Sequence, residues 1–90
     1  MTSDRDLSDS VTSALNVSRV QLDATGLRCP LPLLKAKQAL NQLQPGETLR
    51  VTATDAGSVR DFHAFAELSG NRLISFVEVD GVFEYLLQKQ

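Results

Sequence analysis

The sequence predicts an α/β two-layer sandwich in which two helices cover one face of a four-stranded mixed sheet. Three observations support this fold. Several segments alternate apolar and polar residues, two segments repeat apolar residues every three or four positions, and an Asp-Gly pair separates the last two alternating segments. In chain order these segments give βαβαββ, an arrangement that places both helices on one side of the sheet.

The size and charge of the chain exclude several classes of protein. Its 90 residues fit one domain, and nine basic against eleven acidic residues give a net charge of −2. This balance argues against direct nucleic-acid binding, which favours a basic patch. One cysteine and one histidine are too few for the usual zinc site or an internal disulfide, and we expect no cofactor. With no bilayer-length apolar run and no signal-peptide pattern, we expect a cytoplasmic protein with no membrane contact.

The first element follows a segment of different composition. Residues 1–17 are rich in Ser, Thr and Asp, and we expect them to form a flexible N-terminal tail to a folded domain over residues 18–90. Val20 and Leu22 then alternate with polar neighbours, which predicts a short strand. Gly26 marks the turn after it.

The first helix is expected to begin between two prolines. Apolar residues recur at helical spacing at Leu33, Ala36, Leu40 and Leu43. Proline is tolerated in a first helical turn, so Pro30 and Pro32 fit a helix start, although a following proline biases Leu31 away from helical geometry. Pro45 and Gly46 end the helical pattern.

A second strand and a second helix follow. The strand buries one face, formed by Leu49, Val51 and Ala53. Ser58, with Asp61 three residues later, resembles a capping arrangement at the start of the helix. The helix then presents one face, formed by Phe62, Phe65, Ala66 and Ser69. Gly70 is expected to end it.

The chain ends in a predicted hairpin around Asp80 and Gly81. A two-residue turn pairs Val79 with Val82, Phe76 with Tyr85, and Ile74 with Leu87. The face toward the helices then holds Ile74, Phe76, Phe83, Tyr85 and Leu87. The opposite face holds Leu73, Ser75, Val77, Val79, Val82, Glu84 and Leu86. This apolar face is tolerated surface hydrophobicity, is partly covered by the tail, or is a docking or self-association surface.

Cys29 is the candidate reactive residue. It lies at a helix start, where the positive end of the helix dipole stabilises a thiolate, and Arg28 next to it adds positive charge. We therefore expect a lowered pKa for the thiol. Without a second cysteine, disulfide exchange within the chain is excluded. His63, the sole histidine, is better interpreted as a surface helix residue than as a catalytic base. A thiol without a base can still accept and donate a group by exchange with another protein's thiol or persulfide.

The segment "LDATGLRCPLPLLKAKQAL" resembles the signature of the TusA (SirA-like) family of small sulfur-carrier proteins. The family hallmark Cys-Pro-x-Pro corresponds to Cys29, Pro30 and Pro32, after a lead that includes Gly26. The likeness continues through "PGETLRVTATD" and "SVRDF" and covers residues 18–90. Asp55 and Asp61 match acidic positions of the family pattern.

The resemblance implies a sulfurtransferase that acts as a carrier rather than as a turnover enzyme. Cys29 would accept sulfur as a persulfide from a cysteine desulfurase and relay it to a downstream acceptor protein, in tRNA 2-thiouridine synthesis or another sulfur-trafficking pathway. Arg28, Gly26, Pro30 and Pro32 would support the site, together with Asp55 and Asp61. The alternative is a non-catalytic interaction or regulatory module that uses the open sheet face, with Cys29 structural.

Overall fold

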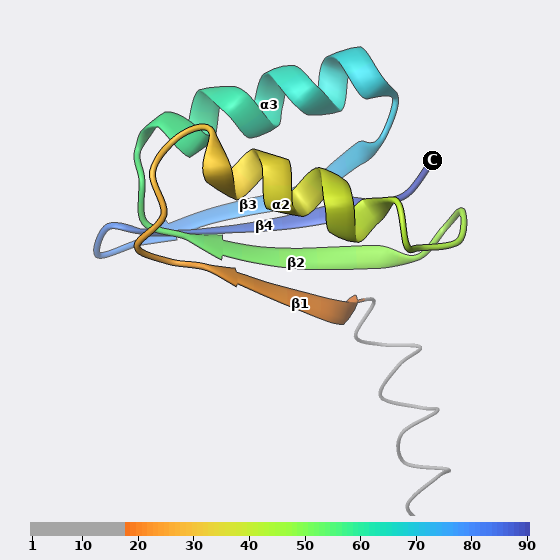
Figure 1. The fold of residues 1–90 in the computed structure, drawn as a ribbon, viewed down its shortest axis with the longest axis horizontal. Helices are drawn as coiled ribbons and strands as arrows, with labels where there is room; N and C mark the ends of the chain where they lie inside the picture. The colour runs from red at the N-terminus through yellow and green to blue at the C-terminus, as the bar shows by residue number, and fades with distance from the viewer. Residues whose placement is uncertain (1–17) are drawn as a thin grey trace, which may run out of the picture.

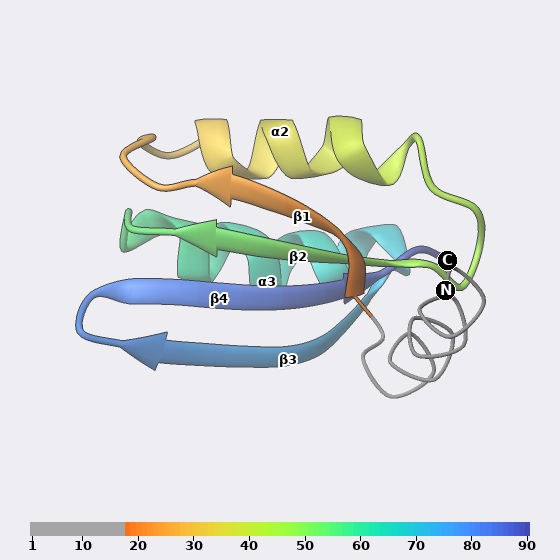
Figure 2. The same ribbon diagram turned by 90° about the horizontal axis from the view of Figure 1, so that it is seen from below.

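The computed structural model of the chain describes residues 18–90, and the expected tail over residues 1–17 lies outside the described residues. The elements are β1 (Ser18–Ala24), α2 (Leu31–Leu40), β2 (Thr48–Ala53), α3 (Gly57–Ser69), β3 (Arg72–Val79) and β4 (Val82–Gln88). The sheet order is β1-β2-β4-β3, with β1 parallel to β2 and β4 antiparallel to both of its neighbours. Both helices cover the same face of this sheet (Figures 1 and 2), so the predicted fold is confirmed. Over residues 18–90, no helix has the length and apolar character needed to cross a membrane.

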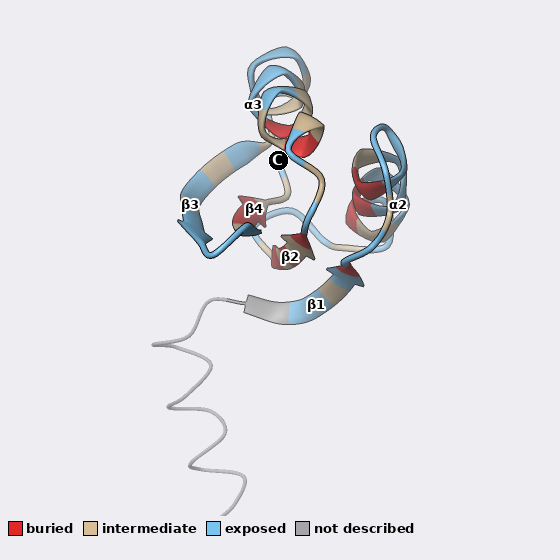
Figure 3. Cartoon of the chain, turned by 90° about the vertical axis from the view of Figure 1, so that its left-hand side faces the viewer, coloured by how far each residue is buried: buried red, intermediate tan, exposed pale blue. Residues whose placement is uncertain are grey.

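The core lies between the sheet and the two helices, where the buried positions gather (Figure 3). The alternation predicted for β2 is confirmed, because Leu49, Val51 and Ala53 are all fully buried. From α3, Phe62 stacks on Tyr85 of β4 with ring centroids 4.2 Å apart. Offset aromatic pairs of this kind add stabilisation beyond the area that they bury. The stack fixes α3 against the sheet and so fixes the residues at its N-terminal end.

The hairpin turn is confirmed, and its register is confirmed over most of its length. Asp80 and Gly81 have φ values of 51° and 79°, and the register pairs Val79 with Val82 and Phe76 with Tyr85. The predicted pair of Ile74 with Leu87 is wrong. Leu73 pairs with Leu87, because the register shifts between Leu73 and Ser75. A bulge adds one residue to one strand and inverts the alternation beyond it.

This bulge changes which side chains reach the core. Leu73, expected on the open face, packs against the buried core, and Ile74, expected in the core, is 39% exposed. Near the hairpin turn the open face is apolar as predicted, with Val77, Val79 and Val82 exposed. Leu86 is an exception at 6% exposed.

An ion pair crosses the open face beside these valines. Arg50 Nη1 donates to Glu84 Oε1 at 2.8 Å, which joins β2 to β4. Ion pairs at a protein surface contribute at most about 1 kcal/mol. The open face therefore mixes an apolar patch with one polar bridge.

The helix α2 begins between the two prolines, as predicted. Pro30 is its N-cap residue and Pro32 lies in its first turn, fully buried. The expectation that Leu31 avoids helical geometry is wrong. Its N–H donates to the Arg28 carbonyl at 2.8 Å, and this tight turn holds Leu31 as the first helical residue. The helix ends at Leu40, before the apolar pattern does, and the chain continues in tight turns.

Candidate functional site

Cys29 lies in the loop that joins β1 to α2, and local polar contacts shape this loop. Asp23 Oδ1 accepts hydrogen bonds from the backbone N–H and the hydroxyl of Thr25, at 3.0 and 2.7 Å. These bonds hold the pKa of the Asp23 carboxyl below its ordinary value. Gly26 has a φ of 80°, a conformation that favours glycine, and its N–H donates to Thr54 Oγ1 at 2.9 Å. The last contact joins the loop to the residue that follows β2.

The Cys29 thiol is exposed and is hydrogen-bonded to a carboxylate of α3. Its Sγ donates to Asp61 Oδ2 at 2.6 Å, across 32 residues of chain. The Cys29–Pro30 peptide bond is cis, and Cys29 precedes the N-cap residue of α2. The thiol is therefore held by α3 as well as by the helix that follows it.

The expectation of a lowered thiol pKa is wrong. The hydrogen bond to Asp61 raises the pKa of Cys29, and desolvation and the negative charges of Asp61 and Asp55 act in the same direction. A carboxylate beside a thiol disfavours the thiolate, since the two negative charges repel. Arg60 acts in the opposite direction. Arg28, the expected cation, is exposed and contributes its backbone carbonyl to the start of α2.

The N-terminal end of α3 is built differently from the expected Ser58–Asp61 cap. Ala56 is the N-cap residue, and Asp55 Oδ2 accepts the Gly57 N–H at 3.0 Å. Ser58 is buried, and its hydroxyl shares a hydrogen bond of 2.7 Å with the Tyr85 hydroxyl. A buried hydroxyl without a partner is costly, so Ser58 pairs with the core rather than with the helix backbone. Asp61 lies in the second turn and is free to meet Cys29.

Gly57 is a site residue that the sequence analysis missed. A Cβ at this position would lie 3.1 Å from Cys29 Cβ and 3.4 Å from Cys29 Sγ. It would also lie 2.9 Å from Asp55 Oδ2. The missing side chain lets the Cys29 loop pack directly against α3. The available signal was a glycine at a helix start, where other residues have better helix propensity.

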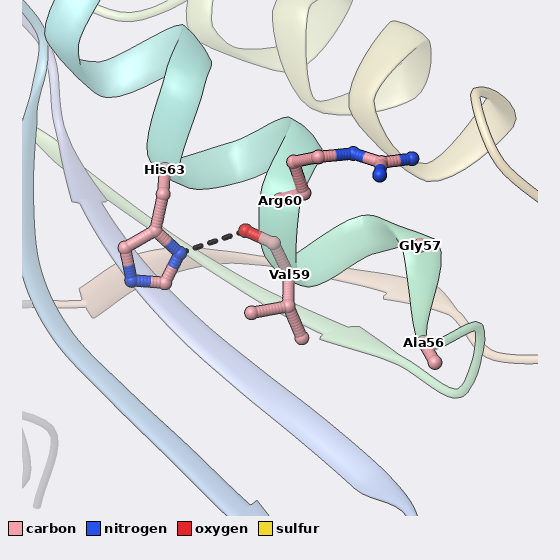
Figure 4. Close-up of a pocket in the computed structure, with 5 residues that line it drawn as sticks. All are labelled: Ala56, Gly57, Val59, Arg60 and His63. Carbon is pink, nitrogen blue, oxygen red and sulfur yellow. Dashed lines mark hydrogen bonds between the residues drawn. The ribbon is translucent and has the colours of Figure 1, made fainter.

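A shallow hollow of about 540 Å³ lies along the first two turns of α3, lined by Ala56, Gly57, Val59, Arg60 and His63 (Figure 4). The Arg60 and His63 side chains point to different sides of the helix (Figure 4). Nδ1 of His63 is hydrogen-bonded to the Val59 carbonyl oxygen at 2.7 Å, and the ring meets Phe76 edge-on. His63 is thus an exposed helix residue, as the sequence indicated.

A second hollow, of about 420 Å³, lies between α2 and α3 and has Asp61 in its wall. Its lining residues are Leu33, Lys37, Asp61, Ala64, Phe65, Leu68 and Ser69. Lys37 Nζ lies 5.6 Å from the centroid of the Phe65 ring, and Leu68 is 88% exposed. This inter-helix groove is mostly apolar and contains the carboxylate that meets the thiol.

Of the predicted site residues, the structure brings Cys29, Asp55 and Asp61 together. Gly57 and Arg60, which were not predicted, lie near the same thiol. Gly26 and Pro30 lie in the loop, and Pro32 is buried in the first turn of α2. Within residues 18–90, no group of three or more His, Cys, Asp or Glu side chains is arranged to hold a metal ion.

The sequence profile of the family described as "Sulfurtransferase TusA" matches residues 20–89. This chain belongs to that family. It is 52% identical over 69 residues to the sulfur carrier protein TusA of Allochromatium vinosum, a match that covers 77% of this chain and 91% of the relative. The crystal structure of a SirA-like protein from Desulfitobacterium hafniense matches with a TM-score of 0.69 and 31% identity, covering 77% of this chain and 95% of that one. The resemblance seen in the sequence is confirmed, and membership assigns the protein a role in sulfur transfer.

Proposed function

We propose that this protein is a sulfur carrier in which Cys29 holds the sulfur as a persulfide. It accepts the sulfur from the persulfide of a cysteine desulfurase and passes it to a downstream acceptor protein. The observation that carries the proposal is the position of Cys29. The sole cysteine of the chain is exposed, in the loop between β1 and α2, and is therefore accessible to another protein's persulfide.

The surroundings of the thiol suit a carrier better than an enzyme that completes its own reaction. A persulfide carrier needs an accessible sulfur and no neighbouring thiol that would discharge it by exchange. The net charge of −2 favours protein partners over direct contact with nucleic acid. The acceptor belongs to tRNA 2-thiouridine synthesis or to another sulfur-trafficking pathway.

Intact-mass spectrometry after incubation with a cysteine desulfurase, cysteine and pyridoxal phosphate tests the proposal. We expect the wild-type chain to gain the mass of one sulfur atom and to lose it on treatment with a reducing thiol. The Cys29→Ser variant keeps the size of the side chain and should gain nothing. A wild-type chain that stays unmodified with several desulfurases would contradict the proposal.

A second candidate function is a non-catalytic interaction module, favoured by the exposed valines of the open sheet face. In that case, Cys29→Ser keeps the cellular function, and Val77→Asp together with Val82→Asp abolishes partner binding. Val77 and Val82 lie near the hairpin turn, and neither packs into the buried core, so both variants should remain folded. If the protein is a sulfur carrier, Cys29→Ser should instead abolish the cellular function.

A further inference from the structure

We infer that Asp61 is the residue that exchanges a proton with Cys29 during sulfur transfer. Its carboxylate takes the thiol proton as sulfur arrives, and then returns a proton to the departing thiolate of the donor. The inference rests on the proposed function and names the acid–base residue of the same site. It is carried by the direct contact of 2.6 Å between Cys29 Sγ and Asp61 Oδ2.

The geometry singles out Asp61 among the ionisable groups around the thiol. A general base must lie within hydrogen-bond reach of the proton that it takes. Asp61 Oδ2 already accepts a hydrogen bond from the Cys29 S–H. Asp55 instead accepts the Gly57 N–H through its Oδ2. His63 is bound to a backbone carbonyl and packs edge-on against Phe76. Arg60 is a cation and takes no proton.

The proposed step conserves atoms and electrons. The donor is a persulfide, R–S–SH, on a cysteine of the desulfurase. The Cys29 S–H bond breaks, its proton passes to Asp61, and the Sγ electron pair forms a bond to the outer sulfur of the donor. The donor S–S bond breaks, its electron pair stays on the donor's cysteine sulfur, and that sulfur takes the proton from Asp61. One thiol and one persulfide give one persulfide and one thiol, so no external oxidant or reductant is needed.

The same contact favours the protonated form of the resting thiol. The hydrogen bond to Asp61 and the charge of Asp55 raise the pKa of Cys29, and Arg60 offsets this in part. Because the thiolate is the reactive form, the resting thiol reacts slowly with alkylating and oxidising agents. Removing the Asp61 charge therefore has two effects of opposite sign. The free thiolate becomes more abundant, and sulfur transfer loses its proton acceptor.

The variant Asp61→Asn tests this pair of effects, since asparagine keeps the size of the side chain but takes no proton. We expect its alkylation by iodoacetamide to be faster at pH 7, with the midpoint of the alkylation profile at lower pH. We expect its single-turnover loading by a cysteine desulfurase to be slower by about 100-fold, the lower end of typical acid–base contributions. Glu67→Gln, which removes an exposed carboxylate from the same helix, is the matched control and should change neither rate. Asp61→Glu should restore part of the loading.

Three outcomes would overturn the inference. Loading of Asp61→Asn at the wild-type rate or faster would mean that thiolate abundance alone governs transfer. Slower alkylation together with slower loading would mean that Asp61 only supports the loop structure. An unmodified wild-type chain would refute the proposed function and the transfer step with it, whatever the alkylation profiles show. A loading rate of the wild type that is slower in heavy water supports the proton transfer without any variant.

Discussion

Replacing Gly57 by alanine places one methyl group into the contact between α3 and the Cys29 loop. The new Cβ would lie 2.9 Å from Asp55 Oδ2 and 3.1 Å from Cys29 Cβ. Carbon atoms in ordinary contact lie about 3.5–4.0 Å apart, so the loop and the helix must separate by several tenths of an ångström. We therefore expect Gly57→Ala to disturb the site and to destabilise the fold.

The size of the effect follows from two opposing contributions. Alanine stabilises a helix by about 0.8–1.0 kcal/mol relative to glycine, and by less at a first helical position. Overpacking a contact of this kind costs about 1–3 kcal/mol. Displacing Asp55 from the Gly57 N–H costs a further amount of about 0.5–2 kcal/mol, which is the usual cost of losing a helix cap. The net expectation is a loss of about 2 kcal/mol in the free energy of unfolding.

Urea denaturation and a pH profile of thiol alkylation measure the two consequences. Moving Cys29 away from Asp61 weakens the hydrogen bond that raises the thiol pKa, so alkylation at pH 7 should become faster. In the Gly57→Ala background, Asp55→Ala should cost less stability than it costs in the wild type, because it removes one of the crowded atoms. A Gly57→Ala variant that is as stable as the wild type, with an unchanged alkylation profile, would refute this reasoning.

Three further predictions concern the core and the hairpin. Tyr85→Phe leaves the buried Ser58 hydroxyl without its partner and should lower the free energy of unfolding, measured with urea, by about 1–3 kcal/mol. The double variant with Ser58→Ala should recover most of this loss. A double variant that is no more stable than Tyr85→Phe would contradict the pairing. Burial raises the pKa of Tyr85, so the folded state retains the neutral phenol and stability should fall as pH rises above about 10, less so in Tyr85→Phe. Gly81→Val forces a β-branched residue to a φ of 79° and should cost about 1–2 kcal/mol, whereas Asp80→Gly should be tolerated. Equal unfolding midpoints for these two hairpin variants would count against a strained turn.

Local patterns were sufficient to predict most of the fold. Alternation in β2, helical spacing in α3 and the Asp80-Gly81 turn each depend on a few neighbouring residues, and each is confirmed. The errors arise where the structure departs from a regular period. The bulge at Ile74 has no marker in the sequence, because alternating apolar residues on both sides permit either register.

The site could be predicted only in part, because its decisive contact joins distant segments. The motif located Cys29, and the family likeness marked Asp55 and Asp61. Helix-dipole reasoning from the Cys29 segment alone gave the wrong direction for the thiol pKa, since the carboxylate that governs it lies 32 residues away. Gly57 was missed for the same reason, because its role is defined by the loop that packs against it.

The parallel pairing of β1 with β2 makes the thiol's chemistry dependent on the completed fold. The loop after β1 carries Cys29 and the segment after β2 leads into α3 with Asp61, so both reach the same edge only when these strands lie side by side. An unfolded chain holds the cysteine without the carboxylate, and its thiol ionises more readily. A thiol reagent at neutral pH therefore labels unfolded molecules before folded ones. The labelling rate of Cys29 therefore indicates what fraction of the protein is folded.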